Sequence, residues 1–172
     1  MSIRIIRLVV ISFVFFFLLA TAFSLMIPSH VRISKAINIK GDKDSIMARI
    51  SHAERWREWY PGMDSVQLFY EEGKIKGVVI NQKDASKPAY MIITKTEADE
   101  VDAQFNGRKL KPVMNVWKTI KYPTTDSITV QWYMDFHLRW YPWEKFASLL
   151  LEKSYAPVME NGLKNLKKEV EN

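Results

Sequence analysis

The chain has 172 residues, of which 48% are hydrophobic and 26% are charged, and its 25 Lys and Arg residues against 19 Asp and Glu give a formal net charge of +6. This length fits one domain with at most a short appendage, and the composition is too apolar for a disordered protein. The lack of cysteine in the sequence excludes a disulfide framework, thiolate zinc sites and cysteine nucleophiles.

A long apolar segment opens the chain. Residues 8–27 carry no charge, and at about 1.5 Å per residue they can cross the ~30 Å apolar core of a bilayer. We therefore expect residues 1–29 to be an N-terminal transmembrane anchor. The alternative is a cleavable signal peptide, because Arg4 and Arg7 precede the apolar run and Ala20-Thr21-Ala22 is similar to a cleavage site. The apolar run continues beyond that site, which favours an uncleaved anchor.

The charges that flank this segment bear on its orientation. Arg4 and Arg7 favour an N-terminus in the cytoplasm. The basic residues between Arg32 and Lys43 nearly balance them on the other side. Because a short N-terminal stub tends to stay inside, we expect a single-pass membrane protein whose remaining domain, residues 30–172, lies on the non-cytoplasmic side.

The remaining domain reads as a strand, two short helices, a series of strands and a long helix. Alternating apolar residues predict a strand over 31–40, and Asp42 or Asp44 can cap a helix that carries Ile46 and Ile50. A second helical piece is predicted at 53–59. Further strands are predicted at 66–70, 75–82, 89–96, 101–105, 113–122 and 128–138, with a polar loop at 83–88 and a hairpin turn at Asn106-Gly107.

The final helix is predicted over residues 142–169 from an apolar stripe at helical spacing. Pro157 is expected to kink or break this helix. Hairpin-length connections between the strands indicate an antiparallel sheet, and the long helix must cover the apolar face of that sheet. The sequence thus predicts an α+β domain.

Two motifs carry a family resemblance. Trp56-Arg57-Glu58-Trp59-Tyr60-Pro61 has the pattern W-x-x-W-x-P, and residues 160–167 have the pattern E-x-G-L-x-N-L-K. Both motifs are similar to ones found in the polyketide cyclase/dehydrase and lipid-transport branch of the START-like (SRPBCC) superfamily, where the second forms the ending. The resemblance covers about 30–172. It implies a helix-grip fold, in which a curved antiparallel sheet wraps around a long C-terminal helix and leaves a pocket between them.

The implied pocket suggests which residues contact a ligand. We expect them on the inner face of the sheet, in the aromatic motif and on the final helix: Trp56, Trp59, Asn115, Thr119, Trp132, Met134, Phe136, Phe146 and Leu150. By strand position, Asn115, Thr119 and Tyr133 are candidate polar wall residues, and a larger side chain at Gly77 would narrow the cavity if Gly77 faces inward. The large side chains could either line the cavity or fill it, and the sequence leaves both alternatives open.

Recognisable catalytic or cofactor motifs are missing from the sequence. His30, His52 and His137 are far apart and without metal-ligand spacing, so no metal is expected. Asp135 and His137 share a strand face, but it is the face opposite the apolar one. No phosphate-binding glycine motif occurs, so no cofactor is assigned, and the basic residues are too scattered among acids for a nucleic-acid partner.

The function that fits best is a membrane-anchored binding domain for an apolar small molecule or lipid, attached to the membrane through residues 8–27. The alternatives are a cyclase- or dehydratase-type enzyme on the same fold, for which we assign no catalytic residue, and a ligandless interaction module. The aromatic run Trp140-Tyr141-Pro142-Trp143 either folds back onto the core or forms a foot at the membrane interface. Protein partners are left open.

Overall fold

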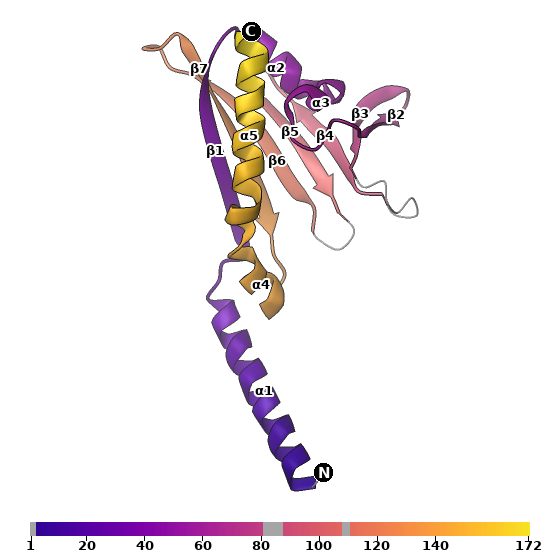
Figure 1. Cartoon of the computed structure of the whole chain (residues 1–172), viewed down its shortest axis with the longest axis vertical. Helices are drawn as coiled ribbons and strands as arrows, with labels where there is room; N and C mark the ends of the chain where they lie inside the picture. The colour runs from indigo at the N-terminus through magenta and orange to yellow at the C-terminus, as the bar shows by residue number, and fades with distance from the viewer. Residues whose placement is uncertain (1–2, 81–87, 108–110) are drawn as a thin grey trace.

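The computed structural model describes residues 3–80, 88–107 and 111–172. Helix α1 (Ile3–Leu25) extends away from the rest of the molecule, and the N-terminus and C-terminus lie at opposite ends (Figure 1). Almost all of its apolar side chains are exposed. The helix is long and apolar enough to cross a membrane, and a signal sequence near an N-terminus has the same character.

The remaining elements form one α+β domain. Its strands are β1 (His30–Lys40), β2 (Gln67–Glu71), β3 (Lys74–Val79), β4 (Tyr90–Thr96), β5 (Glu100–Asn106), β6 (Val113–Lys121) and β7 (Ser127–His137). Its helices are α2 (Lys43–Ser51), a short 3₁₀ turn (Ala53–Arg55), α3 (Trp56–Trp59), α4 (Pro142–Ser148) and α5 (Leu151–Glu171).

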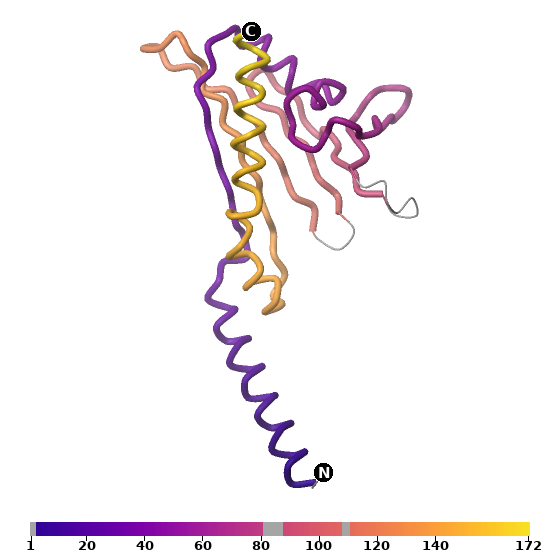
Figure 2. Tube along the Cα trace, viewed as in Figure 1, coloured from indigo at the N-terminus to yellow at the C-terminus, as the bar shows by residue number. Residues whose placement is uncertain are grey.

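The strands of the described residues form a single antiparallel sheet in the order β1-β7-β6-β5-β4-β3-β2. Figure 2 shows α5 running beside β1 along much of its length, while the rest of the sheet extends to one side. The predicted helix-grip arrangement is therefore confirmed. The predicted strand ends and the polar loop within 81–87, and the turn beyond Gly107, lie outside the described residues.

Local chemistry accounts for several boundaries. The Asp42 carboxylate caps α2 by accepting hydrogen bonds from the backbone N–H groups of Asp44 and Ser45, at 3.1 and 3.2 Å. The tight turn between β2 and β3 places Glu72 and Gly73 at positive φ, 51° and 76°. Glycine adopts that conformation without steric cost.

The final helix breaks at a different place from the one predicted. Pro157 lies inside α5 without ending it. The break falls at Leu149 and Leu150, whose N–H groups bond to the carbonyls three residues earlier and so tighten the last turn of α4. A proline removes a single hydrogen bond of the helix, and the packing of α5 against β1 and α3 offsets that loss.

The two sequence motifs connect α5 to the segment before β2. The Trp56 indole N–H donates to the Ile50 carbonyl at 2.7 Å, and the Trp59 indole N–H donates to the Arg49 carbonyl at 3.2 Å. From α5, the Asn165 side chain donates to the Trp59 carbonyl at 3.2 Å. These contacts show that the motif residues hold the fold together.

Gly162 sets how closely α5 approaches the sheet. A Cβ atom at this position would lie 2.8 Å from Cζ3 of Trp132 and 3.1 Å from Cδ of Pro61. Only a residue without a side chain permits this approach.

The Trp132 indole belongs to an aromatic cluster of buried rings, which consists of Trp56, Trp59, Tyr60, Trp117 and Trp132. Neighbouring ring centroids in this cluster are 4.9 to 6.3 Å apart. The cluster fills the space between the sheet, α3 and the middle of α5.

The outer face of the sheet carries an ion pair near the start of β1. Nε and Nη2 of Arg32 donate to the two carboxylate oxygens of Asp135, each at 2.7 Å, and the His30 ring lies 3.1 Å from the same carboxylate. The hydrogen bond from Arg32 lowers the pKa of Asp135, against the opposing effect of burial.

We predict that Gly162→Ala lowers the free energy of unfolding by about 1 kcal/mol. Alanine gains about 1 kcal/mol in helix propensity, but overpacking costs about 1–3 kcal/mol, and the enclosed Trp132 ring cannot move aside. The matched control is the exposed neighbour Asn161→Ala, which keeps the propensity gain without the clash. Urea unfolding of the full chain in mild detergent measures both, and a stabilised Gly162→Ala would contradict this packing.

We predict that Asp135→Asn costs about 1 kcal/mol of stability at neutral pH, a value reduced because the Arg32 side chain is half exposed. A carboxylate whose pKa is lowered in the folded state stabilises the fold at pH values above its pKa in the unfolded state, about 3.9. That stabilisation is lost as the pH falls through the pKa of the folded state. The difference between wild type and variant should therefore shrink below about pH 4. The exposed turn residue Asp126, changed to Asn, serves as the control. A difference that does not change with pH would argue against the ion pair.

Candidate functional site

A cavity lies between the sheet and α5, beside the aromatic cluster. Its volume is about 190 Å³. The walls come from α5, from strands β4 to β7 and from the segments next to α3 and β3, and they consist of Tyr60, Met63, Ile80, Met91, Phe105, Val113, Asn115, Met134 and Tyr155. We call this space the inner cavity. Its lining is largely apolar, with a few polar groups.

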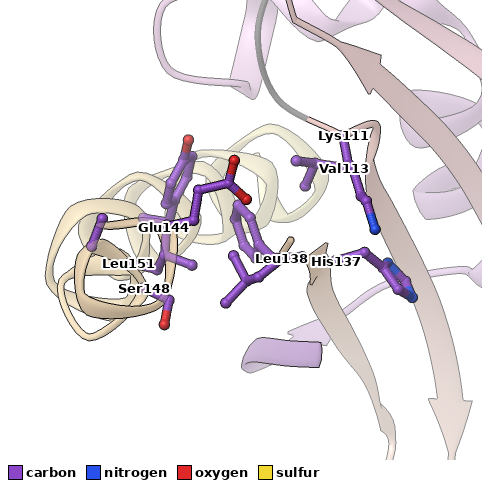
Figure 3. Close-up of a pocket in the computed structure, with 10 residues that line it drawn as sticks. Lys111, Val113, His137, Leu138, Glu144, Ser148 and Leu151 are labelled. Atoms are coloured by element: carbon purple, nitrogen blue, oxygen red, sulfur yellow. The ribbon is translucent and has the colours of Figure 1, made fainter. Parts of the chain in front are cut away.

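A second space of about 100 Å³, the outer cavity, lies between the ends of β6 and β7 and the helices α4 and α5. Figure 3 shows Glu144, Ser148 and Leu151 coming from the helices and Lys111 and His137 from the strand side. The wall residues Val113 and Tyr155 belong to both cavities, which are therefore neighbours.

The polar groups of the inner cavity are two phenols and an amide. Burial raises the pKa of Tyr60, and the nearby Tyr155 adds to this shift. The Tyr60 phenol therefore stays neutral at physiological pH and can donate a hydrogen bond. The Asn115 side-chain oxygen accepts from the Trp132 indole N–H at 3.3 Å, which fixes the amide at the cavity wall. This set of groups suits orienting an apolar ligand that carries one or two polar atoms.

The predicted contact residues divide into separate groups in the structure. Asn115 and Met134 line the inner cavity, and Phe136 lines the outer one. Thr119 is buried away from both, with its hydroxyl 3.3 Å from the Asp99 carbonyl. The sequence left open whether the inner-face side chains line a cavity or fill the core. In the structure some of them line a cavity and others fill the core.

The predicted tryptophans belong to the filled part. Trp56, Trp59 and Trp132 are fully enclosed in the aromatic cluster and contribute to neither cavity wall.

Two residues predicted for the pocket lie on the surface. Phe146 is 42% exposed and Leu150 is 62% exposed, on or just after α4. The structure corrects their placement, because the break before α5 turns this segment away from the sheet.

Two further expectations about the pocket are wrong. Tyr133 lies on the outer face of the sheet, where the Arg32 guanidinium sits 4.2 Å from the centre of its ring. A Cβ atom at Gly77 would lie 2.0 Å from the backbone oxygen of Met91 in the neighbouring strand. A larger residue there would disrupt the pairing of β3 with β4 and would not narrow the cavity.

Sequence reasoning missed Tyr60 and Tyr155 as wall residues. Tyr60 lies within the aromatic motif that carries the family resemblance. The sequence therefore indicated where Tyr60 lies in the fold, but not that it lines the cavity. Tyr155 precedes Pro157 on α5, and only the displaced helix break fixes which side of the helix faces the sheet. Met91 and Phe105 belong to correctly predicted strands, but their distance from α5 could not be derived from the pattern.

The described residues show no candidate metal site, because no group of three potential ligands from His, Cys, Asp and Glu gathers among them. The Asp135 carboxylate is engaged by Arg32 and His30 on the outer face, while His137 stacks on His30 with ring centroids 4.8 Å apart. Asp135 and His137 thus do not reach the inner cavity.

The fold and the two cavities define a helix-grip protein with an internal apolar site. Residues 30–171 match the family described as polyketide cyclase / dehydrase and lipid transport, and the chain belongs to this family. No curated protein sequence matches the chain significantly.

Solved structures of related fold include a START superfamily protein and biosynthetic enzymes. A START superfamily protein from Mycobacterium smegmatis is 14% identical, with a TM-score of 0.58 over 81% of this chain and 97% of that one. Norcoclaurine synthase from Thalictrum flavum is 11% identical, with a TM-score of 0.60 over 82% and 93%. The di-domain ARO/CYC StfQ from the steffimycin biosynthetic pathway is 14% identical, with a TM-score of 0.61 over 83% of this chain and 51% of that one. At these identities the likeness establishes the fold alone.

We predict that Asn115→Leu destabilises the protein by about 1–3 kcal/mol, because it leaves the buried Trp132 indole N–H without its acceptor. In a Trp132→Phe background the same change should cost about 1 kcal/mol less, since no N–H remains to be satisfied. A double-mutant cycle by chemical denaturation measures this coupling. Strictly additive losses would show that the hydrogen bond contributes nothing.

Proposed function

We propose that the protein is a membrane-anchored binding domain for an apolar small molecule or lipid, held between the sheet and α5. The observation that carries this proposal is the inner cavity, an apolar space with a few hydrogen-bonding groups on its wall. Burial of apolar ligand surface is worth about 25 cal/mol per Å², and the polar groups fix the ligand's orientation. In this proposal α1 spans the membrane once, and the domain of residues 30–172 lies on the non-cytoplasmic side.

The size of the cavity limits the ligand. A space of about 190 Å³ is slightly larger than an engineered apolar cavity of about 150 Å³ that holds benzene. The inner cavity thus accepts one ring or a short acyl segment. Because Val113 and Tyr155 line both cavities, movement of these shared side chains would give a longer molecule access to both spaces.

The chemistry of the wall favours binding over catalysis. Among the described residues that line the inner cavity, the ionisable groups are the phenols Tyr60 and Tyr155. The raised pKa of Tyr60 makes it a poor base at neutral pH. A cyclase or dehydratase needs a group that accepts a proton from its substrate, and the carboxylate and imidazole of Glu144 and His137 line the outer cavity only, so binding is the stronger proposal for the inner cavity.

The position of α1 supports a ligand that is poorly soluble in water. Helix α4, which forms one side of the outer cavity, contacts α1. A domain held at a membrane in this way would receive an apolar ligand without a long path through water.

We predict that Val113→Phe lowers the occupancy of a co-purifying ligand at least several-fold. Val113 lines both cavities, so a larger ring fills space that the ligand needs, and overpacking costs only about 1–3 kcal/mol of stability. The matched control is Val10→Phe, which adds the same ring on the exposed surface of α1. The full chain is purified in mild detergent, and its ligand is measured by native mass spectrometry and by extraction into organic solvent.

The outcomes separate the alternatives. A bound apolar molecule in wild type and in Val10→Phe, but reduced in Val113→Phe, supports the binding domain. A ligand-free wild type, unchanged after incubation with membrane lipids, would favour an interaction module. A bound molecule that the protein converts into another would establish the enzyme.

A further inference from the structure

Among the described residues of the domain, large exposed apolar side chains are concentrated around α4. Five large apolar side chains between residues 140 and 150 are 42–67% exposed: Trp140, Trp143, Phe146, Leu149 and Leu150. We call this surface the α4 patch. Outside α1 and the adjoining Met26, the other large exposed apolar residues of the described chain are Tyr70 and Tyr122. Contiguous exposure of this kind marks an interaction surface.

The α4 patch lies where α1 leaves the domain. Figure 1 shows α4 at the end of the domain that faces α1, and the two helices are in contact. If Arg4 and Arg7 hold the beginning of α1 at one membrane surface, the apolar turns from Leu8 to Leu25 extend about 27 Å and end at the other surface. The patch is then level with the membrane interface.

A network of hydrogen bonds fixes α4 to the short segment that follows α1. The Lys145 ammonium group is buried and donates to the Ile27 carbonyl at 2.8 Å and to the Ser29 hydroxyl at 2.7 Å. The backbone N–H of Leu138 donates to the Ser29 carbonyl at 2.8 Å. The residues between α1 and β1 are thus bound from two sides, and they do not act as a free linker.

The composition of the patch suits lipid headgroups. Tryptophan and tyrosine prefer the membrane–water interface, where an apolar ring and a polar group are both satisfied. The Tyr141 and Trp143 rings stack with centroids 4.8 Å apart, and the Arg139 guanidinium lies 5.9 Å from the Tyr141 ring centre and 3.9 Å from the Glu144 carboxylate. The aromatic rings, and not a free charge, therefore carry the preference of this segment for the interface.

We infer that the α4 patch inserts into the headgroup region of the same membrane that α1 spans, and that the outer cavity therefore opens toward the bilayer. This inference rests on the proposed anchoring by α1. It assigns the patch to lipid and not to a protein partner, because the patch continues the apolar surface of α1 at a fixed joint. Helix α4 carries both surfaces, since Ala147 and Ser148 of the outer-cavity wall alternate along its sequence with Phe146 and Leu149 of the patch, so the cavity lies next to the patch. An apolar ligand enters beside α4 directly from the membrane.

The distribution of tryptophans provides a direct test. Trp140 and Trp143 are exposed, whereas the other four tryptophans are buried in the aromatic cluster. The full chain is reconstituted into vesicles of phosphatidylcholine and phosphatidylglycerol that contain lipids brominated close to the glycerol backbone. We expect these lipids to quench tryptophan emission. The Trp140→Phe/Trp143→Phe variant keeps the patch apolar and should lose most of the quenching.

A second pair of variants tests the patch itself. Leu149→Glu with Leu150→Glu places two charges in the patch at exposed positions, and quenching of Trp140 and Trp143 should fall at least twofold. The matched control changes the exposed residues Tyr70 and Tyr122 to Glu, away from α1, and should be quenched like wild type. Far-ultraviolet circular dichroism checks that each variant is folded.

Flotation of the vesicles separates failure of this inference from failure of the anchor. A chain that floats with the vesicles but shows no quenching of the exposed tryptophans would overturn the insertion of the patch and leave the anchor intact. A chain that does not float would overturn both. Equal quenching of the double-Glu variant and its control would also reject the patch as the contacting surface.

Discussion

The close contact between Gly162 and Trp132 is the constraint on which the arrangement of the domain depends. Without a side chain at Gly162, α5 lies directly on the indole ring, and the ring is held in turn by its aromatic neighbours. Rings that must pack here leave no room for a ligand at this part of the sheet. The open volume is therefore displaced toward the beginning of α5, where Tyr155 and not glycine faces the strands. The space between the sheet and α5 is thus filled by aromatic rings near Gly162 and open near Tyr155.

The sequence predicted the fold well because its signals are local. Alternation along β7, the Asp42 cap and the two family motifs each depend on neighbours within a few residues, and the structure has them as expected. The site was predicted less well because it depends on distances between elements. Asn115 and Met134 reached the cavity wall, whereas Trp56 and Trp59 have the same apolar character but serve the core. The apolar pattern of the sequence does not distinguish inward side chains that pack against other side chains from those that line a cavity.

The final helix illustrates a different limit. Proline at position 157 is the stronger local breaker, yet the helix breaks at two leucines, because the chain must turn from the end of β7 to reach α1 before it can lie along β1. This tertiary requirement overrides the local preference. It also decides that Phe146 and Leu150 face outward, so one misplaced break explains both misplaced residues.

The buried Lys145 has a mechanical consequence. Its bonds to Ile27 and Ser29 hold α4 against the segment that joins α1 to β1. A spanning helix tilts when its apolar length exceeds the thickness of the bilayer. If α1 spans a membrane as proposed and this joint stays closed, a thinner bilayer would tilt the domain together with the helix and change the angle at which α4 meets the lipid. Under the proposed anchoring, bilayer thickness would thereby act on the entrance of the outer cavity without any change in the fold.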